Sequence, residues 1–312
     1  MRLLALSLPL AAALTAKQVY QFPYRSQFVE NLALLPTGQV LVTTFDQARL
    51  YTINPHDGSA HVVSQLPGAD ALAGIAQIGP WTYAVAAGRF DAGRLSFAPG
   101  SSQIGIINIR SCKHHHKNDS LQTVARLPQA TLLNGMASLP RYPHIVLTAD
   151  SKTGYIYRVN TRNGRVDIAL QDEALAPGPN PKIIALGVNG IQIHNGYLYV
   201  SHSEKQLVGR YKIDARGNAK GKLDVIAQWP AGLPDDFAVA RNGTVFAADH
   251  DGGLIKIDPD GKQVTLASLN STGVYLDAPT SVKLSKDEKT IFLTAGGNSS
   301  TIGKGGGLII LR

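Results

Sequence analysis

The stretch LGVNGIQIHNGYLYVSHSEKQLVGRYKID, residues 186–214, decides the fold. It contains three short apolar segments, IQI, YLYVS and LVGRYKI, which are separated by polar turn residues. Asn195-Gly196, between the first two segments, is the dipeptide most typical of a two-residue β-hairpin turn. The stretch therefore predicts consecutive antiparallel strands, with Asn189 just before the first strand and His202 just after the second.

The same pattern occurs six times along the chain. Each copy has a few polar or small residues, an apolar strand, a turn that contains Gly and a second strand. The copies begin near Glu30, Ala73, Asn134, Asn189, Asp235 and Thr280, at intervals of 43, 61, 55, 46 and 45 residues. A period of about 40–50 residues with four short strands per unit is typical of a β-propeller. We assign the long second interval to RSCKHHHKND, residues 110–119, as an insertion between two strands.

The chain ends suggest how the ring closes. The sixth repeat offers only three strands and ends in GGLIILR, whereas QVYQFP, residues 18–23, is a spare strand near the N-terminus. Pairing the two would remove an exposed sheet edge. We predict an all-β fold, a six-bladed β-propeller that is closed by the N-terminal strand and forms a single domain over residues 17–312.

The first sixteen residues read as a secretory signal peptide. One Arg precedes an apolar run that is too short to span a bilayer, and small residues follow. We expect cleavage near Ala13 or Ala16 and a secreted chain with no membrane-spanning segment. Sequons at Asn118, Asn242, Asn270 and Asn298 fit that route. Cys112 is the single Cys, so an intrachain disulfide is excluded.

Composition narrows the classes of partner. The chain has 312 residues, a net charge of +8 and only 17% charged residues, which argues against disorder. The basic residues are scattered and form no stripe, so we expect no nucleic-acid partner. We expect a monomer that binds a small molecule.

Propeller topology would gather the repeat starts at one mouth of the channel. The innermost strand of each blade starts at one rim and the second strand returns to it. Residues that follow the second strands, by our alignment Asp46, Arg89, Asp150, His202, His250 and Gly296, should join the six starting residues there. Loops on a rigid scaffold commonly carry function.

The polar residues of this mouth allow two kinds of chemistry. Glu30, Asn134, Asn189 and Asp235 are oxygen donors of the type that Ca²⁺ prefers, although residues of these types also cap strands and form turns. His202 and His250 could act as bases or proton shuttles, although a His can also fill a blade junction.

Other candidates would form the walls of the pocket. Arg89 would add a cation, and Phe45, Phe90 and Tyr275 would add aromatic surface, unless the aromatic residues serve core packing. Asn134 and Asp150 are further candidates for substrate binding. KHHHK, residues 113–117, lies at the predicted opposite rim, where a solvated loop is favoured over a metal site. No motif of a nucleophilic serine hydrolase is present.

Four segments carry a family resemblance: ENLALLPTGQVLVTTF, GVNGIQIHNGYLYVSHS, LPDDFAVARNGTVFAADH and APTSVKLSKDEKTIFLTAGG. Together they resemble a fungal family of secreted six-bladed propellers related to the senescence-marker-protein/gluconolactonase fold. Some members are similar to the hetero-Diels–Alderases of tropolone–sesquiterpenoid biosynthesis, which join an o-quinone methide to a humulene-type alkene. The resemblance covers nearly the whole mature chain.

The lactonase branch of the resemblance implies a divalent-ion site. Its Glu of blade one, Asn of blade four and Asp of blade five fall on Glu30, Asn189 and Asp235, and Asn134 is a further candidate ligand. This chain has Asp-Asp-Phe where the lactonases have Asp-Gly, so Asp236 adds a carboxylate at the mouth.

Three functions follow as hypotheses. The first is a pericyclase of fungal secondary metabolism that needs no cofactor, with hydrogen bonds from His202, His250 or Arg89 to the substrate oxygen. The second is a lactonase dependent on Ca²⁺ or Zn²⁺, with Asp236 or a His activating water. The third is a propeller that binds a small molecule without catalysis.

Overall fold

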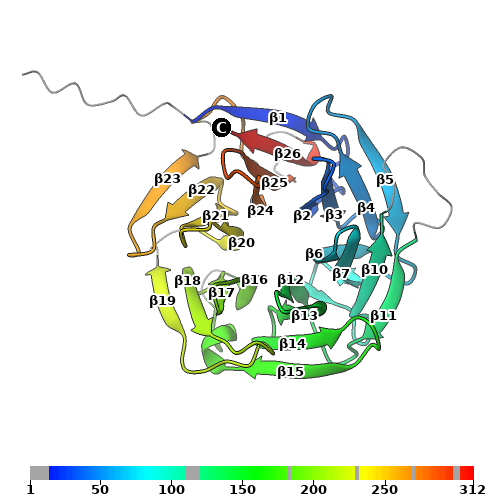
Figure 1. Ribbon diagram of the computed structural model, residues 1–312. Helices are drawn as coiled ribbons and strands as arrows, with labels where there is room; N and C mark the ends of the chain where they lie inside the picture. The colour runs from blue at the N-terminus through cyan, green and yellow to red at the C-terminus, as the bar shows by residue number, and fades with distance from the viewer. Residues whose placement is uncertain (1–13, 110–119, 182–183, 229–231, 269–270, 298–302) are drawn as a thin grey trace, which may run out of the picture.

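A computed structural model describes residues 14–109, 120–181, 184–228, 232–268, 271–297 and 303–312. Six four-stranded antiparallel sheets stand as blades around a central axis, which confirms the predicted six-bladed propeller (Figure 1). Within those ranges, the single helical element is a 3-10 turn, η1, at Glu173–Leu175, and no helix is long and apolar enough to cross a membrane.

The blades follow one another along the chain, and each is listed from the axis outward. Blade 1 contains β2 (Val29–Leu34), β3 (Val40–Thr44), β4 (Arg49–Ile53) and β5 (Ala60–Gln65). Blade 2 contains β6 (Ala71–Gly79), β7 (Thr82–Gly88), β10 (Gln103–Asn108) and β11 (Gln122–Arg126). Blade 3 contains β12 (Leu133–Leu139), β13 (Tyr142–Asp150), β14 (Tyr155–Asn160) and β15 (Val166–Gln171). Blade 4 contains β16 (Val188–His194), β17 (Tyr197–His202), β18 (Leu207–Lys212) and β19 (Asp224–Gln228). Blade 5 contains β20 (Pro234–Val239), β21 (Val245–Asp249), β22 (Gly253–Ile257) and β23 (Gln263–Ser268). Blade 6 contains β24 (Pro279–Leu284), β25 (Ile291–Gly297), β26 (Gly305–Leu311) and β1 (Ala16–Gln21).

The N-terminal strand closes the ring, as predicted. β1 pairs antiparallel with β26, and the two strands lie side by side at the outer edge of blade 6 (Figure 1). Phe22, which follows β1, is buried, with its ring centroid 5.0 Å from that of Tyr20 and 4.9 Å from that of Tyr51 in blade 1. The first strand therefore ties the last blade to the first. Of the two expected cleavage points, the one near Ala13 would leave all of β1 in the mature chain.

Every innermost strand carries an irregularity at the mouth. In each blade, the pairing with the second strand slips by one residue where the repeat begins; in blade 1, for example, Val29 pairs with Thr44 but Asn31 pairs with Thr43. A bulge of this kind leaves the extra residue unpaired and redirects its side chain. The bulges explain why five of the six starting residues line the channel, whereas the sixth, Thr280, is buried and donates to the Val29 backbone oxygen of blade 1.

The Gly that follows the polar starting residue in blades 3 and 4 allows neighbouring blades to touch. A Cβ atom at Gly135 would lie 2.6 Å from the Asn189 backbone oxygen, and one at Gly190 would lie 2.5 Å from Asp236 Oδ1. No side chain fits these spaces, since non-bonded carbon atoms normally stay 3.5–4.0 Å apart. The Asn-Gly pair that opens the strand is thus a packing requirement of the ring.

Blade 2 contains a hairpin that the repeat pattern did not predict. β8 (Phe90–Asp91) and β9 (Ser96–Phe97) form a two-stranded sheet within the segment that connects β7 to β10 along the chain. The hairpin, together with the insertion before β11, accounts for the long second interval. Residues 110–119, which include Cys112 and KHHHK, lie outside the described residues but fall between β10 and β11, where the insertion was predicted.

Candidate functional site

The beginnings of the innermost strands surround a cavity of about 410 Å³. Most of its polar lining residues lie at the mouth ends of blades 1, 3, 4 and 5, and together they form the polar floor: Glu30, Asn134, Asn189, Ser203, Asp235 and His250. Ser26, before β2, is a further polar lining residue. Its apolar lining includes Phe28, Phe45, Phe90, Leu95, Leu133 and Leu186. A pocket with a few convergent polar groups and a mostly apolar wall is the usual form of a small-molecule site.

Two carboxyl groups of the cavity are buried and lie near a third. Burial, reinforced by the negative charges of Asp235 and Asp236, raises the pKa of Glu30 well above its usual range. Burial also raises the pKa of Asp235, although the neighbouring His250 opposes this shift. Compared with an exposed carboxyl, Glu30 thus holds a proton more readily, and the protonated form can donate a hydrogen bond.

His250 forms the one ion pair that is recorded among these polar lining residues. Its Nδ1 lies 3.6 Å from Asp235 Oδ2. Burial favours the neutral imidazole, but the combined attraction of Asp235, Asp251 and Asp249 outweighs it and raises the pKa of His250. The ring lies against Phe28, with 6.2 Å between ring centroids. Asp235 thus orients the imidazole and leaves Nε2 as the nitrogen available to a ligand.

Two amide oxygens of the cavity are buried without a hydrogen-bond donor, Asn134 Oδ1 and Asn189 Oδ1. The other side of the Asn189 amide is occupied, because its Nδ2 donates to Ser203 Oγ over 3.0 Å. Buried acceptors without a partner in the protein are costly and often mark a binding site. The two oxygens would accept a hydrogen bond from a ligand or coordinate a cation.

The same residues fit a hard divalent cation. Glu30, Asn189 and Asp235 supply oxygen atoms to one cavity, and Asn134 adds another, as the lactonase resemblance implied. Counting only His, Cys, Asp and Glu, no group of three in the described ranges is arranged to hold a metal. A cation here would therefore depend on the Asn oxygens.

The alignment of His202 with His250 is wrong. His202 pairs with Val188 at the start of β16, and the residue that pairs with the start of β20 is Asp249 and not His250. The side chain at the level of His250 in blade 4 is that of Ser203. Since neighbouring residues at a strand end point in different directions, a one-residue error exchanged a buried side chain for one that lines the cavity.

His202 is fully buried outside the cavity lining. Its Nε2 donates to the Ala176 backbone oxygen over 3.1 Å, and its Nδ1 accepts the Lys205 backbone N–H over 3.1 Å. Burial lowers the pKa of His202 to about 4. The neutral ring joins two loops through its two hydrogen bonds, which is the structural role that the sequence left open.

Three further candidates also lie outside the cavity lining. Asp150 is buried and accepts the backbone N–H groups of Thr131 and Leu132, so it fixes the entry into β12. Arg89 is exposed at the start of the loop that carries the hairpin, and Tyr275 is half-buried before β24. Phe45 and Asn134, by contrast, line the cavity as predicted.

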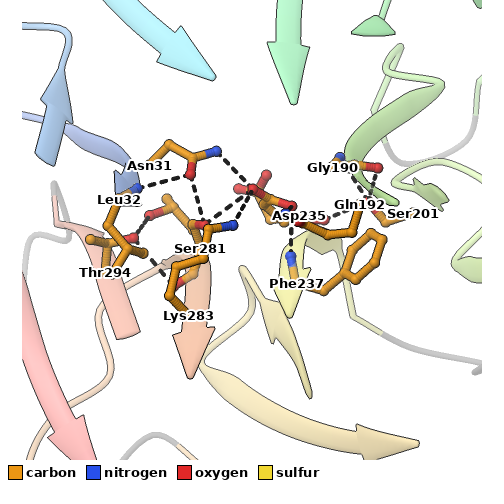
Figure 2. A network of polar contacts seen from close by, with 12 residues as sticks. Asn31, Leu32, Gly190, Gln192, Ser201, Asp235, Phe237, Ser281, Lys283 and Thr294 are labelled. Atoms are coloured by element: carbon orange, nitrogen blue, oxygen red, sulfur yellow. Dashed lines mark hydrogen bonds and ion pairs between the residues drawn. The ribbon is translucent and has the colours of Figure 1, made fainter. Parts of the chain in front are cut away.

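Asp236 lies beneath the cavity and not within it. Its carboxylate accepts hydrogen bonds from Asn31 Nδ2 (2.8 Å) and Ser281 Oγ (3.2 Å), and Lys283 Nζ lies 3.8 Å away. Figure 2 labels these three partners, which come from blades 1 and 6. Gln192 Nε2 donates from blade 4 over 3.4 Å. The network joins blades 1, 4, 5 and 6 below the polar floor. A second hollow of about 450 Å³, lined in part by Gln192 and Lys283, lies beyond it.

Sequence reasoning missed Phe28, Ser203 and Leu95 as lining residues. The interval of 61 residues in blade 2 was the signal for an additional element near the mouth, but we assigned it wholly to the other rim. Of the predicted glycosylation sites, Asn242 is exposed in the turn between β20 and β21, whereas Asn118, Asn270 and Asn298 lie outside the described residues.

Comparison of the sequence with curated proteins gives two relatives that are both named "Putative hetero-Diels-Alderase". The protein asR5 of Sarocladium schorii is 26% identical over 88% of this chain and 76% of its own length. A protein of a Phoma species is 24% identical over 91% of this chain and 87% of its own length. No family model matches the chain.

Solved structures share the fold at low identity. A gluconolactonase of Xanthomonas campestris superposes with a TM-score of 0.64 at 14% identity, covering 95% of this chain and 88% of that one. A luciferin-regenerating enzyme gives a TM-score of 0.68 at 14% identity, with 96% and 95% covered. A PQQ-bound aldose sugar dehydrogenase of Streptomyces coelicolor gives 0.64 at 16% identity, with 97% and 99% covered. Their different activities show that this fold does not decide the chemistry. The chain is thus a six-bladed β-propeller that shares its fold with a gluconolactonase and has relatives in sequence that bear the name of hetero-Diels–Alderases, as the resemblance in its sequence indicated.

Proposed function

We propose that this protein is a pericyclase of the hetero-Diels–Alder type, which joins an o-quinone methide-type diene to a terpenoid alkene. The observation that carries the proposal is the division of one cavity into a polar floor, with His250 and Glu30, and an apolar wall, with Phe28, Phe45 and Phe90. The names of the two relatives in sequence support the same reaction type.

The reaction suits a site of this kind. A hetero-Diels–Alder addition forms one C–C and one C–O bond from π electrons, so no group leaves and no protein nucleophile is required. The protein must hold two reactants in an orientation close to that of the reaction. Such pre-organisation can lower the activation free energy by several kcal/mol. The apolar wall would hold the hydrocarbon, and the floor would hold the oxygen of the diene.

His250 is the proposed hydrogen-bond donor to that oxygen. Negative charge builds on the quinone-methide oxygen as the bonds form, so a donor fixed in place beforehand stabilises the transition state more than the reactants. Asp235 positions the donor through the 3.6 Å ion pair. When protonated, the Glu30 carboxyl would be a second donor at the same floor, and its burial favours that form. His202 and Arg89 have no part in this proposal, because neither lines the cavity.

A metal-dependent lactonase is the second candidate, and the unpartnered oxygens of Asn134 and Asn189 favour it. Glu30, Asn189 and Asp235 would hold Ca²⁺ or another hard cation, which would polarise a lactone carbonyl when bound. His250, which lines the same cavity, would then be the candidate base for a water molecule. Binding without catalysis is the remaining possibility.

One experiment separates the three. The purified protein is treated with EDTA, dialysed, and given either an o-quinone methide precursor with a humulene-type alkene or a panel of sugar lactones, with and without added Ca²⁺. A pericyclase should accelerate adduct formation and impose its stereochemistry after chelation. A lactonase should hydrolyse lactone only with the ion restored. Acceleration of neither reaction, at any metal loading, would leave only the binding role and overturn the proposal.

A further inference from the structure

We infer that the β8–β9 hairpin of blade 2 determines substrate specificity, with Phe90 and Leu95 forming a wall that holds the hydrocarbon part of the ligand. The inference deepens the proposed function and rests on it for the nature of the ligand. Its residues lie outside the polar floor, so the two proposals can fail separately.

The hairpin is an addition to the repeat. In the described connections between second and third strands, blades 1, 3, 4 and 5 use short turns, at residues 45–48, 151–154, 203–206 and 250–252. In blade 2 the same connection runs from residue 89 to residue 102 and contains the hairpin. It carries Phe90, Ala92 and Leu95 to the cavity.

The base of the hairpin is firmly attached to the ring. The Phe97 ring is buried against Gly88, where a Cβ atom would lie only 2.4 Å from it. The Phe97 N–H donates to the Thr131 backbone oxygen over 2.7 Å, and the Phe90 N–H donates to Asp70 Oδ1 over 2.6 Å. These contacts fix the position of the hairpin relative to blade 3.

The tip presents an apolar side chain at an energetic cost. Leu95 has φ of 48°, in the left-handed region, and its side chain lines the cavity although the residue is 38% exposed. Left-handed backbone is unfavourable for an L-residue with a Cβ atom, and Leu has no side-chain polar group to offset this cost. Asp91 orders the turn by accepting the N–H groups of Gly93 and Arg94. The turn accounts for the left-handed backbone, as at Gln206 in blade 4, but it does not require an apolar side chain. Contact with an apolar ligand accounts for the exposed Leu at this position.

Leu95 extends an aromatic surface that begins in blade 1. The rings of Phe28 and Phe45 have centroids 5.5 Å apart, and those of Phe45 and Phe90 are 4.7 Å apart. This row has no polar atom to offer a ligand. A hydrocarbon such as an unfunctionalised alkene fits it, whereas a sugar lactone, which carries hydroxyl groups around its ring, does not.

The test uses Leu95→Gly with Arg94→Ala as the matched control. Glycine relieves the left-handed backbone and removes the side chain, while Arg94 is exposed on the same tip and does not line the cavity. The probe is the neutral fluorophore N-phenyl-1-naphthylamine, titrated into the purified protein, with thermal unfolding measured in parallel. Leu95→Gly should bind the probe about five- to twenty-fold more weakly, as expected for the loss of one apolar side chain. Its Tm should equal or exceed that of the wild type, and Arg94→Ala should match the wild type in affinity.

A merely structural hairpin predicts the opposite pattern, with lower Tm and unchanged affinity for Leu95→Gly, and this outcome would overturn the inference. Leu95→Asn, which tolerates the same backbone but is polar, should weaken binding as Gly does. The probe undergoes no reaction, so its binding is measured independently of catalysis. If probe binding weakens in Leu95→Gly but the wild type catalyses no cycloaddition, only the proposed function is contradicted. If the wild type catalyses cycloaddition but probe binding is unchanged in Leu95→Gly, only the inference about the hairpin is contradicted.

Discussion

His250 Nδ1 lies 3.6 Å from Asp235 Oδ2, at the level of the ring where Asn189 donates to Ser203 one blade earlier. The Asn189–Ser203 pair of blade 4 and the Asp235–His250 pair of blade 5 thus occupy equivalent positions, but only the pair of blade 5 consists of titratable groups. This difference within a repeated backbone locates the proposed chemistry at blade 5.

Replacing His250 should slow adduct formation. His250→Ala removes the proposed donor to the substrate oxygen, and we expect a rate about 100-fold lower, by analogy with the loss of an oxyanion donor. The measurement is the initial rate and stereoselectivity of adduct formation, with folding checked by circular dichroism. His202→Asn is the matched control and should stay within a few-fold of the wild type. Equal rates for His250→Ala and the wild type would place the donor elsewhere.

Replacing Asp235 should separate the two enzyme hypotheses. In a lactonase, Asp235→Ala removes a metal ligand and should cost orders of magnitude in hydrolysis. In a pericyclase it loosens His250 without removing the donor, so it should cost less than His250→Ala. Rates of both reactions for both variants give the answer. A larger cycloaddition defect in Asp235→Ala than in His250→Ala would contradict the positioning role.

Acid should destabilise the protein through His202. Its pKa is lowered from 6.5 to about 4 in the folded state, so the unfolded chain binds a proton more readily. The stabilising contribution is fully present above pH 6.5 and is lost as the pH falls toward 4, by at most about 3 kcal/mol. Urea unfolding at several pH values measures it. His202→Asn should have a lower free energy of unfolding at neutral pH, but that free energy should depend less on pH between 6.5 and 4. An unchanged slope would mean that other groups dominate.

A side chain at Gly190 should disrupt the contact between blades 4 and 5. Its Cβ would lie 2.5 Å from Asp236 Oδ1 and 2.6 Å from Asp236 Cα. Gly190→Ala should lower the free energy of unfolding by about 1–3 kcal/mol or more, since backbone must move. Gly79→Ala is the control, because its Cβ would meet nothing closer than 3.4 Å. Equal unfolding curves for the two variants would refute this account of the Asn-Gly pair.

Deleting residues 18–22 should abolish soluble expression. The deletion removes most of β1 and the buried Phe22, so β26 would become an exposed edge. A chain that begins at Leu14 keeps β1 intact and should fold normally. Soluble yield and circular dichroism compare the two, and a folded deletion variant would show that the ring does not need its first strand.

The sequence by itself determined the architecture of this protein. Strand length, Gly-containing turns and alternation of apolar residues are local properties, and their sixfold recurrence left one closed ring as the way to bury every blade. The sixth repeat, which ends with the strand around Leu308, lacked a fourth strand, and the spare strand around Tyr20 supplied it by pairing at that edge. The same pattern identified Glu30, Asn134, Asn189 and Asp235 as residues of one mouth, because the innermost strands all start at the same rim.

Only the tertiary structure decided which side chains meet in the cavity. His202 and His250 look alike in the sequence, but their positions in the blades differ by one residue. His202 is the last paired residue of β17, whereas the last paired residue of β21 is Asp249, and His250 follows it. A displacement of one residue turns a side chain from the cavity to the interior, and it depends on non-local pairing that periodicity does not encode. The apolar wall has the same origin, since Leu95 reaches the cavity through a hairpin whose position is fixed by contacts with blade 3 and not by the repeat.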